Sequence, residues 1–371
     1  MKSFSEYIKI MEEKTQKIGN HIEKSFLSSF SNKKELYITL SGSISLILGF
    51  LGFFINANWS ILPIIALVIT SIYGWLNYQE ITAKWLMFLT TIFTILILGL
   101  ITSYLLIKSI PVISHMGIES IIKLEPPYWN VGNGIFSLTP MIWGTFLTTM
   151  LAMLIAAPLG IIGAIFISEI SPPRLRDFFK PSVEVLAGIP SIVYGYLGYV
   201  VLNQYMMKNL NLTSYGSLFI AGLVIGVMAL PTVVSVSEDA ITAVPDAVKD
   251  GSVALGLTDW QTLNNITLPA AISGITSATL LGVGRAVGET MAATVILGHA
   301  QVLPKPLYDI FGNTETLTSL IASQYGHASP GEMHLKALFL SGLFLFVVIL
   351  LISIISQRIE IRMKRKLEGK E

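Results

Sequence analysis

The chain alternates long apolar stretches with short polar ones. Eight stretches approach the roughly 20 residues that a helix needs to cross a bilayer core of about 30 Å. They cover residues 36–55, 60–77, 85–107, 141–168, 182–203, 216–237, 270–298 and 335–357. This pattern predicts an all-α, polytopic membrane protein with about eight transmembrane helices.

The composition also indicates that lipid is the main solvent of this chain. Of its 371 residues, 53% are hydrophobic and 13% are charged, whereas a soluble domain carries about a quarter charged residues. The net charge of +1 argues against a dedicated nucleic-acid binder. The chain has no cysteine, and its five histidines lack the spacing of metal ligands, so we expect neither a metal nor another cofactor.

The distribution of lysine and arginine predicts the orientation in the cell membrane. Residues 1–36 are polar and contain no cleavable signal, so targeting is expected to reside in the spans. An even number of spans places both termini on one side. That side collects the N-terminal lysines, Lys84, Arg174, Arg176, Lys180, Lys249 and the basic C-terminal residues. Because cytoplasmic loops retain Lys and Arg, we expect both termini in the cytoplasm.

We divide the chain into four parts. They are a cytoplasmic amphipathic segment (1–35), an additional two-helix hairpin (36–85), a six-helix core (86–358) and a basic cytoplasmic tail (359–371). The first part either lies on the membrane surface or is a solvated helix that orients the first span. The external segment 109–140 carries turn signals and is expected to form a structured cap.

The cytoplasmic loop 238–269 is acidic, which departs from the positive-inside trend and indicates a docking surface. It contains Asp250-Gly251-Ser252, three residues, Gly256, nine residues, and then Ile266-Thr267-Leu268-Pro269. We expect a short helix, a turn at Gly256, a second helix, and Pro269 in the first turn of the next span, where its missing N–H costs nothing.

This spacing resembles the EAA signature of ABC-transporter permeases, which reads Glu-Ala-Ala, three residues, Gly, nine residues, Ile-x-Leu-Pro. Asp-Gly-Ser replaces Glu-Ala-Ala, and the spacing agrees at every anchor. The resemblance implies that the short helix seats in a groove of a nucleotide-binding subunit. The residues that it assigns to this coupling loop are Asp250, Gly251, Ser252, Gly256, Ile266, Leu268 and Pro269. An unrelated cytoplasmic helix-turn-helix is the alternative.

Residues 140–145, 186–195, 229–233 and 284–292 resemble the phosphate-specific ABC transporter permeases. The last of these is more similar to the C-type subunit than to the A-type subunit. The resemblance implies ATP-driven import of inorganic phosphate along a path shared with a homologous A-type permease. It further implies an external phosphate-binding protein and two copies of an ATP-binding subunit. The chain has no Gly-x-x-x-x-Gly-Lys-Ser/Thr loop, so ATP hydrolysis is expected in another chain.

Arg285 and Glu289 are four residues apart in an apolar stretch, so on one helix they would share a face and pair. Charged groups at bilayer depth normally face a bundle interior or a watery path, and a guanidinium matches the geometry of phosphate. We therefore expect this pair to line the substrate path, with structural pairing as the alternative. Pro190 and Pro231 interrupt spans and are candidate hinges or static bends.

Other functions fit the sequence less well. A permease for another oxyanion, such as sulfate or molybdate, or an A-type phosphate subunit, is the alternative within transport. A membrane-embedded enzyme would need a nucleophile and a base, or a metal triad, and Arg285 with Glu289 supplies neither, so no catalytic residue is expected. A scaffold without transport would leave that intramembrane pair unexplained.

Overall fold

The computed structural model describes residues 33–55, 57–210 and 215–367. The chain divides into two compact units, residues 1–101 and 102–371. Most of the expected amphipathic segment and the end of the expected basic tail lie outside the described residues. The described part is almost entirely helical, in agreement with the predicted class.

The first unit is built around a short apolar hairpin. It contains α2 (Lys33–Ile55), η1 (Ala57–Ser60), α3 (Ile61–Asn77) and the beginning of α4 (Gln79–Ile121). Trp85 of α4 is buried, and its Nε1 donates a hydrogen bond to Ser43 Oγ at 3.0 Å. Gly42 of α2 packs directly against the Trp85 ring, where a larger side chain would clash. Trp85 therefore joins α4 to the hairpin.

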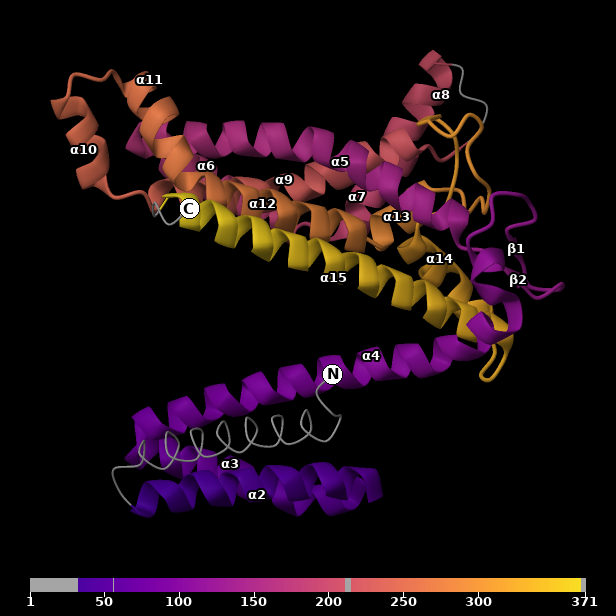
Figure 1. Cartoon of the computed structure of the whole chain (residues 1–371), viewed down its shortest axis with the longest axis horizontal. Helices are drawn as coiled ribbons and strands as arrows, with labels where there is room; N and C mark the ends of the chain where they lie inside the picture. Colours follow the sequence, from indigo (N-terminus) through magenta and orange to yellow (C-terminus); the bar gives the residue numbers. More distant parts are fainter. Residues whose placement is uncertain (1–32, 56, 211–214, 368–371) are drawn as a thin grey trace, which may run out of the picture. The chain divides into compact units, whose positions relative to one another are not determined.

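The second unit contains the remaining elements. They are β1 (Trp129–Asn130), β2 (Ile135–Phe136), α5 (Thr139–Ile165), η2 (Phe166–Ile170), α6 (Pro173–Gly188), α7 (Ser191–Leu197), η3 (Gly198–Asn203), α8 (Gln204–Leu210), α9 (Leu218–Thr242), α10 (Asp246–Ala254), α11 (Asp259–Thr262), η4 (Leu263–Thr267), α12 (Leu268–Gly288), α13 (Met291–Ile296), α14 (Leu317–Gln324), η5 (Tyr325–His327) and α15 (Met333–Leu367). Within this unit, α10 and α11 lie at one end, and the β1–β2 hairpin, α8 and the loop after α13 lie at the other (Figure 1).

The core of the second unit is the contact between α5 and α9. Glycines let the two backbones approach closely: a Cβ on Gly226 would come within 2.8 Å of the Ala152 carbonyl oxygen. On the facing helix, a Cβ on Gly160 would meet Val233 Cγ1 at 2.7 Å. Small residues at such contacts are typical of helices that pack in lipid, where van der Waals contact replaces the hydrophobic effect. The α5–α9 pair is thus the frame on which the other helices pack.

Each predicted span has a helical counterpart. Among the residues that the structure describes, six helices are long and apolar enough to cross a membrane: Asn58–Asn77, Gln79–Ile121, Thr139–Ile170, Leu218–Thr242, Asp259–Gly288 and Met333–Met363. A seventh candidate is the pair Pro173–Gly188 and Ser191–Asn209, which is bent by 85°. The apolar part of α2, Thr39–Gly52, is shorter than a full span.

Two predicted spans are interrupted rather than continuous. The fifth breaks at Ile189, whose extended backbone (φ −69°, ψ 128°) is the conformation favoured before a proline. The seventh ends at Gly288 and resumes at Met291. The first break follows from Pro190, and the second lies at Glu289 and Thr290, two polar residues within an otherwise apolar stretch that hydropathy averages into one span.

The segment 109–140 differs from the expected cap in its first part. Residues as far as Ile121 continue α4, with a non-helical Gly117 (φ 73°, ψ 156°) that kinks the helix. A small antiparallel hairpin then pairs Trp129 with Phe136. Phe136 is buried in a cluster with Ile121 and residues of α14 and α15, so the hairpin is packed onto the helices.

Candidate functional site

The expected ion pair between Arg285 and Glu289 is absent from the described residues, because the helix ends between them. α12 stops at Gly288, and Glu289 has an extended backbone (φ −67°, ψ 123°). The Glu289 carboxylate accepts a hydrogen bond from the backbone N–H of Ala292, three residues later in the chain, at 3.2 Å. The rule that residues four apart share a face holds only on a continuous helix, so the pairing prediction was wrong.

Arg285 instead contacts α9. Its Nη1 donates to Thr232 Oγ1 at 2.8 Å, next to Pro231. Within the described part of the chain this is the one hydrogen bond of the guanidinium, which has five donors. Arg285 is half-buried. A cation in this position keeps donors available for an anionic ligand.

The two interrupted helices pack on each other. α7 follows the break at Pro190, and Gly195 of α7 lies so close to α13 that an added Cβ would come within 2.9 Å of Ala292 Cα. At Pro190 the helix is interrupted, and the two segments on either side of it are bent by 85°. α9, in contrast, runs through Pro231 without interruption. Of the two candidate hinges, Pro190 is the one at which the helix stops.

The loop 238–269 has the expected turn. Gly256 has φ +81°, a backbone conformation that side-chain-bearing residues rarely adopt. A capping box between Thr258 and Gln261 then starts α11. Pro269 is the second residue of α12 and so lies in its first turn, as predicted, although α11, η4 and α12 follow each other as one helical run of 30 residues. The π turn Leu263–Thr267 ends two residues before the proline, which cannot donate a helical hydrogen bond.

The surface of this loop is acidic and apolar. Leu255 is 83% exposed and Trp260 is 69% exposed. Asp250, Asp259 and Trp260 line a pocket of about 440 Å³. An added Cβ on Gly251 would meet nothing within 4 Å, so this face of α10 is open.

The loop is held to the helical frame by polar contacts. Lys249 Nζ of α10 pairs with Glu169 of η2 at 2.7 Å, with both side chains about one-fifth exposed. The Ser252 and Thr262 hydroxyls lie 2.7 Å apart and are buried, which joins α10 to α11. Ile266 and Leu268 belong to the helical run that enters the membrane. The loop is thus attached to η2 through Lys249, and its two helices are attached to each other through Ser252 and Thr262.

Glu238 does not belong to the acidic surface that the sequence indicated. It is 2% exposed and lies in the last turns of α9. Its carboxylate accepts from Arg176 Nη2 and from Lys180 Nζ, each at 2.6 Å. Arg176 and Lys180 are four residues apart on α6 and therefore share one face of the helix. This spacing is the feature of the sequence that could have indicated a common acidic partner. The clamp attaches α6 to α9.

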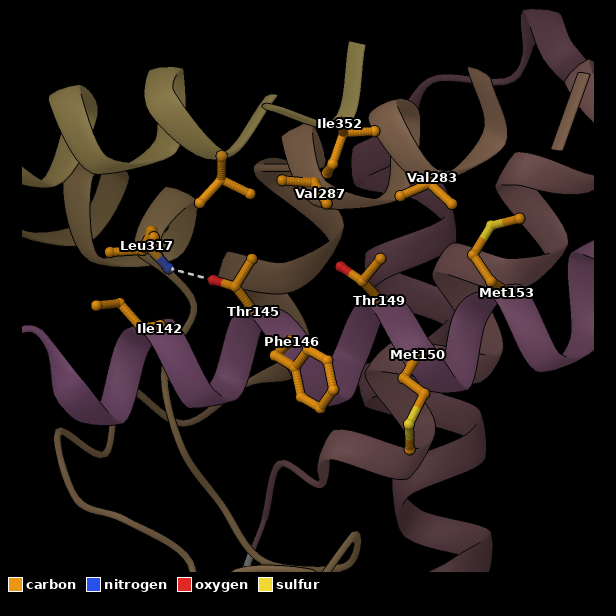
Figure 2. A pocket seen from close by; sticks show the side chains of 11 residues that line it. Ile142, Thr145, Phe146, Thr149, Met150, Met153, Val283, Val287, Leu317 and Ile352 are labelled. Carbon is orange, nitrogen blue, oxygen red and sulfur yellow. Dashed lines mark hydrogen bonds between the residues drawn. The ribbon is translucent and has the colours of Figure 1, made fainter. Parts of the chain in front are cut away.

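A second pocket lies among α5, α12, α14 and α15. Figure 2 shows its lining, which includes Phe146, Met153, Val283 and Val287 and encloses about 450 Å³. Thr145 Oγ1, which also faces it, already accepts from the Leu317 backbone N–H at 3.0 Å. The lining is apolar and offers no charged partner to an anion. Elsewhere among the described residues, no group of three or more His, Asp or Glu is placed to hold a metal ion.

Comparison with known proteins shows the family to which this chain belongs. The family of binding-protein-dependent transport system inner membrane components matches residues 156–365. The chain belongs to this family. The helical core, the loop with the turn at Gly256 and the re-entry at Pro269 are therefore features of an ABC-type inner membrane component. The family resemblance seen in the sequence is confirmed.

Within this family, the chain is similar to several permeases of known or probable assignment. The probable ABC transporter permease protein YqgH of Bacillus subtilis is 38% identical, over 70% of this chain and 84% of its own length. The phosphate transport system permease protein PstC of Xylella fastidiosa is 36% identical, over 64% and 78%. The probable PstC of Methanocaldococcus jannaschii is 33% identical, over 72% and 89%.

The fold of the inner membrane component also matches a solved transporter. A chain from the crystal structure of a bacterial alginate ABC transporter, in complex with an alginate-bound periplasmic protein, aligns with a TM-score of 0.52 and 16% identity. The alignment covers 77% of this chain and 98% of that chain. At this identity the match shows the fold alone.

The Glu238 clamp generates a stability prediction. Glu238→Gln removes the charge that two cations share at a buried position, so we expect a loss of about 1–3 kcal/mol in unfolding free energy. The measurement is the thermal unfolding midpoint of the purified protein in detergent. Asp239→Asn is the matched control, because Asp239 is 66% exposed and contacts Lys180 at 3.2 Å; its effect should be under about 0.5 kcal/mol. Equal effects of the two substitutions would contradict the clamp.

Proposed function

We propose that this chain is the C-type permease subunit of an ATP-driven importer of inorganic phosphate in the cell membrane. The observation that carries the substrate assignment is the similarity to PstC proteins over about two thirds of the chain. The relatives named for phosphate favour this substrate over sulfate or molybdate. ATP hydrolysis is assigned to a separate subunit.

Arg285 is proposed to contact the transported anion. It is half-buried beside the interruption at Glu289, and most of its donors are free of protein acceptors within the described residues. A guanidinium fork binds a tetrahedral oxyanion through two parallel hydrogen bonds. Glu289 is proposed to shape the path by capping α13 at Ala292 rather than by neutralising Arg285. Pro190 is the proposed hinge of the neighbouring broken helix.

The α10–α11 loop is proposed to dock on the ATP-binding subunit. Its exposed apolar side chains, Leu255 and Trp260, and its acidic pocket form a protruding surface at one end of the unit (Figure 1). The distribution of Lys and Arg supports a cytoplasmic location for this end and for both termini. The expected assembly contains two ATP-binding subunits, a homologous A-type permease and an external phosphate-binding protein at the opposite end.

Reconstitution of the complete complex tests the substrate. Proteoliposomes with ATP inside and phosphate-loaded binding protein outside should take up radiolabelled phosphate. Because the proposed system is specific for phosphate, sulfate or molybdate at about a hundredfold molar excess should not displace phosphate from its site. Uptake of phosphate should therefore be unchanged. Uptake of labelled sulfate or molybdate in place of phosphate would overturn the assignment.

The docking role predicts the behaviour of two glycines. Gly251→Trp places a large side chain on the open face of α10, and Gly256→Pro is incompatible with φ +81°. Both variants should insert in the membrane but lose co-purification with the ATPase subunit. Gly326→Trp, at an equally open glycine outside the loop, is the control and should co-purify normally. Retained co-purification and stimulated ATPase activity in both loop variants would contradict the docking assignment.

The path role predicts a difference between Arg285 and Glu289. Arg285→Lys keeps the charge but loses the fork, so phosphate uptake per assembled complex should fall about tenfold or more. Glu289→Gln keeps an oxygen that can accept from the Ala292 N–H, so its effect should be under about threefold. Uptake is normalised to the amount of assembled complex. Unchanged uptake in Arg285→Lys would remove Arg285 from the path.

A further inference from the structure

A buried carboxylate outside the proposed path connects three separate stretches of chain. Glu315 is fully buried. Its oxygens accept hydrogen bonds from Ser323 Oγ at 2.7 Å and Gln301 Nε2 at 3.4 Å, and His299 Nδ1 lies 3.2 Å from Oε1. A carboxylate is costly to bury unless such partners surround it. The cluster therefore fastens the loop after α13 to α14.

The backbone at His299 is also unusual. His299 has φ +55°, and it is the non-glycine residue with positive φ among the described residues. Such a conformation persists when surrounding contacts hold it. The contact of His299 with Glu315 is one of these. A second is the hydrogen bond from the neighbouring Gly298 N–H to Asn313 Oδ1 at 3.3 Å. The loop is thus fixed in one conformation directly after α13.

Glu315 is followed by Thr316, the N-cap of α14, and the first turn of α14 contacts the interruption. Thr318 Oγ1 donates to the Glu289 backbone carbonyl at 2.8 Å. The Leu317 N–H donates to Thr145 Oγ1 of α5 at 3.0 Å (Figure 2). The free carbonyl at the break between α12 and α13 is therefore satisfied by α14, the helix whose Ser323 donates to Glu315.

We propose that Glu315 is a positioning residue that, through α14, holds the Glu289 interruption beside Arg285 in its working conformation. The inference rests on the proposed function, in which Arg285 contacts the anion. Glu315 itself does not contact the anion, because it is sealed from solvent and carries the same sign of charge. It acts through the Thr318 contact.

The absence of cysteine from the chain allows a direct test. A single Thr290→Cys reporter, next to Glu289, is labelled with a hydrophilic maleimide in the assembled complex. The first test variant is Glu315→Gln, which removes the charge and replaces one acceptor oxygen of the cluster with an amide donor. The second is a pair: Ser323→Ala removes one donor, and Ser323→Thr retains it. Glu332→Gln, an exposed acid-to-amide change, is the control.

We expect Glu315→Gln and Ser323→Ala to raise the labelling rate about fivefold, which is the change in an equilibrium that corresponds to one net hydrogen bond. Phosphate uptake per complex should fall in parallel. Ser323→Thr and Glu332→Gln should label and transport like the reporter protein. A purely structural role would instead lower the yield of complex and leave labelling of the assembled fraction unchanged.

Equal labelling rates in all variants would overturn the inference. If Glu315→Gln does not assemble, the comparison of Ser323→Ala with Ser323→Thr decides, and equal rates in these two would overturn it. The labelling readout does not require phosphate transport. Failure of the unmodified complex to transport phosphate would therefore refute the proposed function, whereas equal labelling would refute this inference alone.

Discussion

A helix that stops inside a bilayer leaves backbone N–H and C=O groups without partners, and lipid supplies none. The two interrupted helices of this chain are therefore tolerated only where protein surrounds them. At the second break, Thr318 Oγ1 satisfies the Glu289 carbonyl and the Glu289 carboxylate satisfies the Ala292 N–H. At the first, α7 packs against α13 through Gly195. At the second break this requirement brings α14 against the chain between α12 and α13, four residues from Arg285.

The α5–α9 pair makes this arrangement possible because it is closely packed and continuous. α9 supplies Thr232 to Arg285 near its middle and Glu238 to the α6 clamp near its end. α5 supplies Thr145 to α14, and η2 at its end supplies Glu169 to Lys249. One rigid frame thus carries the contacts of both the interrupted helices and the α10–α11 loop.

Local signals in the sequence predicted the local features. The apolar stretches located the helices, and the spacing around Gly256 predicted its turn, because a positive φ depends on the residue itself. The pairing of Arg285 with Glu289 was predicted wrongly because it assumed a continuous helix, which Gly288 ends. Glu238 was assigned to an exposed loop because its partners, Arg176 and Lys180, lie about 60 residues away. Glu315 was overlooked for the same reason: its role depends on contacts that only the folded chain creates.

The bend at Pro190 has a mechanical consequence. α6 is fastened to the end of α9 by Glu238, and α10 is the next element of the chain after α9. Because the α6 and α7 segments meet at 85°, a displacement of α6 along its own axis becomes a sideways displacement of α7. A bend that keeps its angle thus acts as a right-angle lever, and α7 contacts α13 at Ala292, two residues after Thr290.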